Sequence, residues 1–136
     1  MSQVLAEVLD AELELVRDLI AACREEQQAL RRDDLNRLIT AVEIKKKLAV
    51  ELAAVEKRRL EAQAELGAGA EIAGRTGTGL AEKKADLVKA LRELKEINST
   101  NELLIRQSLA YARRMLALLL PDGGREAGEV LFSRTV

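Results

Sequence analysis

The sequence predicts an all-α protein, an elongated antiparallel three-helix bundle or coiled coil with a long third helix and a flexible C-terminal tail. Of its 136 residues, 24 are Leu and 21 are Ala, and both types favour helices. Aromatic residues, which favour strands, are limited to one Phe and one Tyr. Apolar residues also recur at alternating steps of three and four along three segments, which is the spacing of one helix face.

The first helix is predicted at about residues 4–32. Its apolar face consists of Leu9, Leu13, Val16, Ile20, Cys23, Gln27 and Leu30. Because Cys23 lies on this face, we interpret it as a small core residue. The sequence RRDD at residues 31–34 then predicts a break, in which Asp33 or Asp34 caps the next helix.

The second helix is predicted at residues 35–66. Its inner side is expected to carry Leu35, Leu38, Ile39, Val42, Ala49, Leu52, Val55 and Ala62. The basic runs at 45–47 and 56–59 alternate with glutamates at helical spacing. We therefore interpret both runs as a solvated face with weak ion pairs.

A glycine-rich loop at residues 67–79 is predicted to connect the second helix to the third, at about residues 80–120. The loop sequence GRTGTG lacks the Lys-Ser or Lys-Thr pair of a phosphate-binding loop. Pro121 ends the third helix, so residues 1–120 are predicted as one helical domain and residues 121–136 as a flexible tail.

Composition excludes several functions. The 22 basic residues nearly balance 23 acidic ones, so no nucleic-acid partner is expected. With no histidine and one cysteine, the chain lacks the commonest general base and the usual metal ligands, so we predict no cofactor and no enzymatic activity. Carboxylate sites for Mg²⁺ or Ca²⁺ remain open, but no DxDxDG-type loop supports them, and no metal site is predicted. No apolar run approaches the roughly 20 residues that span a bilayer, so we expect a soluble, cytoplasmic protein without membrane insertion.

Polar residues interrupt the apolar face of the third helix at Asn98, Asn101 and Ser108. A buried amide without a partner costs on the order of 1 to 3 kcal/mol, so each of these groups needs one. Two interpretations remain open. They fix this helix against the first, where Gln27 offers a matching amide, or they face another molecule.

Residues 103–120 are apolar around more than half of the helix, and Arg106, Arg113 and Arg114 confine the polar side to a narrow strip. A three-helix bundle covers only about a third to a half of each member. The apolar surface that the bundle leaves uncovered indicates a partner-binding site. The alternatives are that the chain forms a homodimer through this surface, or that the tail folds over it.

The segment NSTNELLIRQSL at residues 98–109 resembles the FlgN family of flagellar export chaperones. It reproduces the family pattern NxxNxxLIxxSL with Asn98, Asn101, Leu104, Ile105, Ser108 and Leu109. The order of two long helices, a glycine-rich joint and a third long helix is also similar, from about residue 5 to residue 120.

The resemblance implies a non-enzymatic cytoplasmic chaperone of flagellar type III export. Such a chaperone binds the C-terminal helices of hook–filament junction proteins, prevents their premature assembly and delivers them to the export gate or its ATPase complex. The residues expected to bind the partner are Asn98, Asn101, Leu104, Ile105, Ser108, Leu109, Tyr111, Ala112, Met115 and Leu116. The competing hypothesis is a structural coiled coil that self-associates through its third helix.

The tail departs from the family pattern. Members of the family often carry a tyrosine followed by glycine after the third helix, associated with docking on the export gate. This tail has no tyrosine, and we expect Leu131 and Phe132 to supply the docking contact instead.

Overall fold

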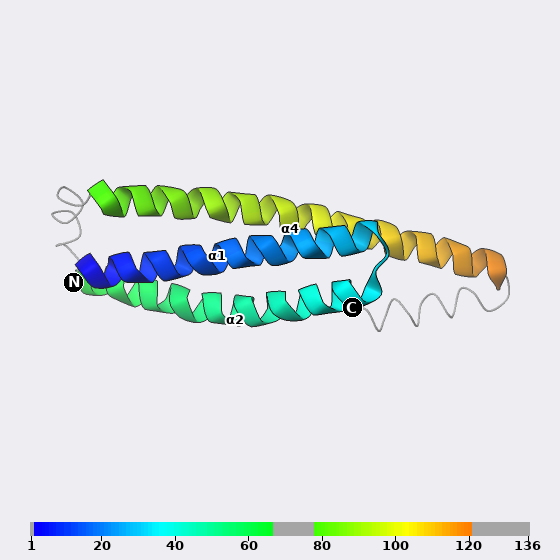
Figure 1. Ribbon diagram of the computed structural model, residues 1–136, viewed down its shortest axis with the longest axis horizontal. Coiled ribbons are helices and arrows are strands. Elements are labelled where there is room, and N and C mark those ends of the chain that lie inside the picture. The colour runs from blue at the N-terminus through cyan, green and yellow to red at the C-terminus, as the bar shows by residue number, and fades with distance from the viewer. Residues whose placement is uncertain (1, 67–77, 121–136) are drawn as a thin grey trace. The chain divides into compact units, whose positions relative to one another are not determined.

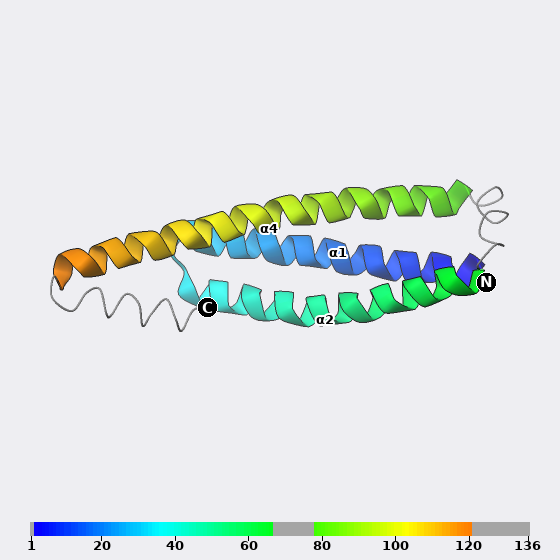
Figure 2. The ribbon, with the colours of Figure 1, turned by 180° about the vertical axis from the view of Figure 1, so that it is seen from behind.

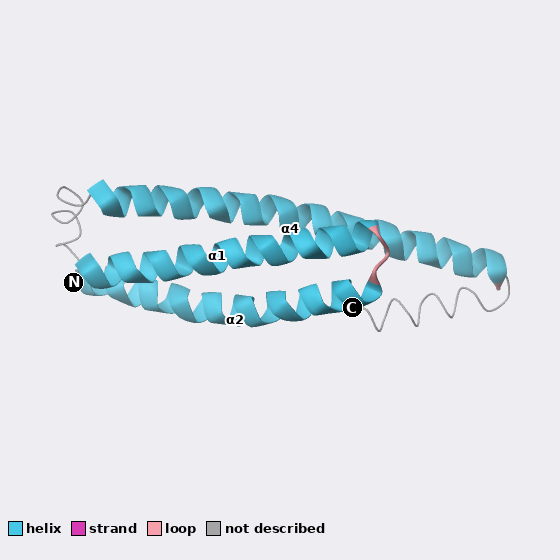
Figure 3. Ribbon diagram, viewed as in Figure 1, coloured by secondary structure: helices cyan, strands magenta, loops and turns pink. Residues whose placement is uncertain are grey.

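The chain folds into three helices in a computed structural model that describes residues 2–66 and 78–120. The helices are α1 (Ser2–Arg31), α2 (Leu35–Leu66) and α4 (Thr78–Leu119), and no strand occurs within those residues (Figure 3). The all-α prediction is therefore confirmed. The predicted flexible tail and most of the predicted glycine-rich loop lie outside the described residues.

The chain divides into two units within α4. The first ends at Asn98, and the second begins at Ser99 and is described to residue 120. The first unit contains α1, α2 and the first half of α4. The second contains the remainder of α4 and therefore most of the predicted partner-binding residues.

In the first unit, α2 runs antiparallel to α1. Glu12 pairs with Arg59 near one end of the two helices, and Glu25 pairs with Arg37 near the other. Because the residue number falls on α2 as it rises on α1, the two chain directions are opposite. Both ribbon views show this hairpin (Figures 1 and 2).

The first half of α4 runs parallel to α1. Lys83 lies 2.7 Å from Asp10, and further along both helices Glu93 pairs with Arg24. Residue numbers here rise together. The order of directions within this unit is thus up, down and up, as the apolar spacing predicted.

The core of the first unit is built mainly from α1. Its buried apolar residues form a stripe along α1 from Leu5 to Ala29, joined by Leu87 and Ala90 of α4. Cys23 has no exposed surface, which confirms its interpretation as a core residue. Because α1 contacts α2 on one side and α4 on the other, it buries more apolar surface than either neighbour.

The inner side of α2 follows the prediction at Leu52 and Ala62, which pack against the core, but differs near the start of the helix. Leu35 and Ile39 were expected to face the core, but they are exposed, and Ala41 is buried instead, with 3% of its surface accessible. Apolar residues occupy two neighbouring rows of α2, so spacing alone did not determine which row faces α1. The row that contains Ala41 faces α1, and its small side chain lets the backbones of α1 and α2 approach closely.

The connection between α1 and α2 ends one helix and begins the next within three residues. Asp33 adopts a left-handed conformation, with φ of 53°, and the Asp34 amide donates a 2.9 Å hydrogen bond to the Ala29 carbonyl. This is the bond of a Schellman helix end. The Arg37 amide in turn donates a 3.2 Å bond to Asp34 Oδ1, which identifies Asp34 as the cap of α2.

The ion pair between Glu12 and Arg59 contains a buried carboxylate. Glu12 has no exposed surface, and its Oε2 lies 2.8 Å from Arg59 Nε. Burial raises the pKa of the Glu12 carboxyl, and the charge of Arg59 opposes that shift. The pair therefore connects α1 to α2 at an electrostatic cost.

Candidate partner-binding surface

Apolar side chains between residues 103 and 120 form an exposed surface on the second unit, which we call the apolar band. Its most accessible members are Leu118, 77% exposed, and Leu119, 70% exposed, and Tyr111 follows at 60%. Tyr111 and Leu118 are seven residues apart, so they lie on the same side of the helix. The exposed large members are Leu103, Tyr111, Met115, Leu118, Leu119 and Leu120. Contiguous apolar surface of this kind is typical of an interaction site.

The residues predicted to bind a partner fall into three groups. Leu104, Ile105, Leu109 and Leu116 are half-buried members of the band. Those that lie exposed on the surface of the helix are Ser108, Tyr111, Ala112 and Met115. Of the two asparagines, Asn98 is half-buried and belongs to the first unit, whereas Asn101 is buried. Eight of the ten predicted residues therefore present accessible surface within the second unit.

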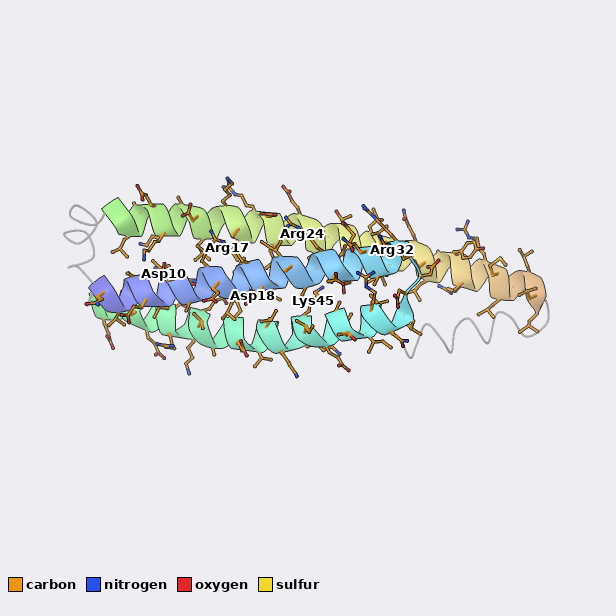
Figure 4. The ribbon with its side chains drawn as sticks, viewed as in Figure 1. Asp10, Arg17, Asp18, Arg24, Arg32 and Lys45 are labelled. Carbon is orange, nitrogen blue, oxygen red and sulfur yellow. The ribbon has the colours of Figure 1, made fainter. Side chains whose placement is uncertain are left out.

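Asn98 belongs to the first unit and has a partner there. Lys45 Nζ donates a 2.8 Å hydrogen bond to Asn98 Oδ1 and lies 3.0 Å from Glu26 Oε1. The residue that bonds Asn98 is thus a lysine of α2, whereas the sequence suggested Gln27 of α1. Figure 4 labels Lys45 in the space between α1 and α2.

This cluster corrects the interpretation of the basic run at 45–47 as a solvated face. Lys46 and Lys47 are exposed, but the Lys45 side chain is only 23% exposed and bonds to two helices. Glu26, its anionic partner, is 3% exposed. A buried carboxylate requires a paired cation, so the first lysine of the run points inward.

Asn101 and Ser108 continue the polar positions into the second unit, but their environments differ. Asn101 is buried, with 1% of its surface accessible, whereas Ser108 is exposed. The helix face that is enclosed at Asn101 is therefore open to solvent seven residues later.

The sequence analysis missed two features. Leu103 and Leu118 were recognised as apolar surface but left out of the predicted binding residues, although both are exposed. A groove between α1 and α2 was not predicted at all. Its only indication in the sequence is a set of alanines, at positions 21, 22 and 41, that is too common to identify a site.

The surface is suited to noncovalent binding. Among the residues that the structure describes, no group of three or more His, Cys, Asp or Glu could hold a metal ion. No helix within the same residues is long and apolar enough to cross a membrane. The chemistry that the apolar band offers is the burial of a partner's apolar side chains, with arginines at the edge of the contact.

Comparison with known proteins identifies the family. No curated protein and no solved structure matches the chain. The family model described as FlgN protein matches residues 1–128, which is nearly the whole chain. The protein therefore belongs to the FlgN family of flagellar export chaperones.

Proposed function

We propose that the protein is a cytoplasmic chaperone for hook–filament junction proteins and binds the C-terminal helical region of these subunits. The proposal is supported most by the exposed apolar band, because a free amphipathic helix needs an apolar partner of similar length. Membership of a flagellar chaperone family makes a flagellar subunit the natural client. Binding would keep the client from assembling early.

In this proposal the predicted residues have two roles. Leu104, Ile105, Leu109 and Leu116, together with exposed Ser108, Tyr111, Ala112 and Met115, form the contact with the client. Asn98 and Asn101 lie just before the band and position this part of α4. The hydrogen bond between Lys45 and Asn98 supports the second role, since it ties α4 to α2 where the first unit ends.

Calorimetry with a C-terminal helical peptide of a junction protein tests the proposal. Tyr111→Glu and Met115→Glu place a charge on exposed positions of the band, so each should weaken binding by about tenfold or more without loss of helicity. Val88→Glu is the matched control. It places the same charge on an exposed apolar position of the first half of α4. Normal binding by both band variants would disprove this use of the band.

The proposal extends to delivery of the client to the export gate or its ATPase complex, with Leu131 and Phe132 as the docking contact. Both residues lie outside the described part of the chain, so this step rests on the family and on the short apolar cluster of Val130, Leu131 and Phe132 in the sequence. The double variant Leu131→Ala/Phe132→Ala should no longer be captured by the purified export gate but should still bind the junction peptide. Unchanged capture would exclude the tail as the docking contact.

The second candidate function is a structural coiled coil that uses the same band only for its own assembly. The exposure of Leu118 and Leu119 favours this candidate equally, because self-association would cover them. A protein of this kind binds no junction peptide at any concentration. The calorimetric experiment therefore separates the two functions.

A further inference from the structure

A groove with a volume of about 610 Å³ lies between α1 and α2 in the first unit. The residues that define it here are Asp18, Ala21, Ala22 and Glu25 of α1, with Ala41 and Ile44 of α2. Its volume is in the range of pockets that hold several large side chains. All the described residues that line it belong to α1 and α2.

The groove owes its depth to small side chains. Ala22 and Ala41 are buried, and Ala21 beside them is exposed, so alanines occupy positions where larger residues would fill the space. Ile44, 46% exposed, forms an apolar wall. A surface of this kind accepts leucine-sized side chains from a second helix, as a hole accepts a knob in helix packing.

One edge of the groove is acidic. Asp18 and Glu25 lie on an exposed stripe of α1 that also carries Glu7 and Glu14, at steps of seven, four and seven residues. Figure 4 labels Asp18 on the ribbon of α1. Arg37 of the opposite wall bonds Glu25 at 2.8 Å. Beyond that pair the α1 edge presents negative charge to an incoming helix.

The second half of α4 has the complementary pattern. Residues 99–120 contain three arginines and one acidic residue, and two of the arginines, Arg106 and Arg113, are seven residues apart. Asp18 and Glu25 have the same separation. Leu109 and Leu116 each follow one of these arginines by three residues, so an apolar row lies beside the basic row.

We propose that the α1–α2 groove binds the apolar band of a second copy of this chain. Leu109 and Leu116 of one copy occupy the alanine-lined hollow of the other, and Arg106 and Arg113 face Asp18 and Glu25, so that the Glu25 carboxylate is shared with Arg37. Such an arrangement covers the band of the free protein, and a client then has to displace the second copy. The inference rests on the proposed function only in this last step, since self-association itself requires no client.

Sedimentation of the full chain over micromolar concentrations tests the inference. We expect reversible self-association that weakens by about tenfold in Asp18→Arg and in Arg113→Asp, because each places like charges opposite one another. Asp86→Arg is the control for the first change, since Asp86 is exposed on the first half of α4. Circular dichroism of each variant establishes that the helices remain.

A charge swap makes the test specific. Asp18→Arg should recover self-association when combined with Arg113→Asp or with Arg106→Asp, and the combination that recovers it gives the direction of the docked helix. A wild-type chain that stays monomeric at every concentration overturns the inference. Equal weakening by Asp86→Arg, or recovery in neither combination, overturns it as well.

The two proposals fail in different experiments. If the chain is monomeric and binds the junction peptide normally, the inference is wrong and the proposed function is supported. If the chain self-associates but binds no junction peptide, binding of a second copy in the groove is supported and the proposed function is wrong. If both hold, added peptide should shift the sedimenting species toward a complex of one chaperone with one peptide.

Discussion

Lys45 of α2 donates a hydrogen bond to Asn98 of α4 across 2.8 Å, and Asn98 is the last residue of the first unit. The same ammonium lies 3.0 Å from Glu26 of α1. One side chain therefore contacts all three helices at the point in α4 beyond which the apolar band begins. Its position makes Lys45 a determinant of stability.

Replacing Lys45 with methionine should lower the free energy of unfolding by about 2 kcal/mol, because Glu26 stays buried after its cation is removed. Urea denaturation followed by circular dichroism measures the change. The neighbouring Lys46→Met removes the same charge from an exposed position and should change stability by less than about 0.5 kcal/mol. Equal effects of the two substitutions would contradict the bridging role.

The buried pair of Glu12 and Arg59 makes a different prediction. Arg59→Met leaves the Glu12 carboxyl enclosed without its partner and should cost about 3 kcal/mol, whereas the double variant Glu12→Leu/Arg59→Met should return to within about 1 kcal/mol of the wild type. The measurement is a double-mutant cycle in urea. Arg58→Met, at an exposed position, is the control. A double variant less stable than Arg59→Met would show that the pair itself stabilises the fold.

The raised pKa of Glu12 predicts how stability depends on pH. The folded protein holds the Glu12 proton more tightly than the unfolded chain does, so the contribution is favourable below the unfolded pKa and is lost as pH rises through the folded pKa. Relative to Glu12→Gln, the wild type should therefore become less stable as the pH rises above the ordinary carboxyl pKa of 4.5 and through the raised pKa of the folded state. Glu14→Gln, an exposed neighbour, should show no such trend. A difference that grows in favour of the wild type would reverse the sign assigned to burial.

The turn between α1 and α2 predicts opposite effects at adjacent residues. Asp33→Gly should stabilise the protein by about 0.5 to 1 kcal/mol, because glycine adopts the left-handed conformation without a steric penalty. Asp34→Ala should cost about 1 kcal/mol, because the first turn of α2 loses its cap. Thermal unfolding measures the change in stability of each variant relative to the wild type, and the two changes should have opposite signs. If both substitutions destabilise, the side chain of Asp33 has a role that the turn geometry does not explain.

The helices and the central core were predictable, because Leu and Ala spacing on α1 leaves one continuous face and Cys23 lies on it. The inner side of α2 was predicted correctly at Leu52 and Ala62 but not near the start of the helix. There Ile39 and Ala41 belong to neighbouring rows, and only the approach of α1 selects between them. The inward direction of Lys45 was also unpredictable, because it depends on Glu26 and Asn98, which are distant in the sequence. The exposure of Tyr111 could be predicted, because residues 103–120 carry more apolar side chains than a three-helix bundle can cover. That comparison needs only the sequence of one helix.

The enclosed thiol of Cys23 gives the protein an internal reporter of its own opening. The side chain has no accessible surface, and burial raises the pKa of the thiol, so the thiolate that reacts with alkylating reagents is suppressed in the folded state. Alkylation should therefore proceed only through molecules in which α1 has separated from its neighbours, at a rate that tracks the population of that opened form. Because the chain has no other cysteine, mass spectrometry of the intact protein can follow this opening of α1 without any engineered label.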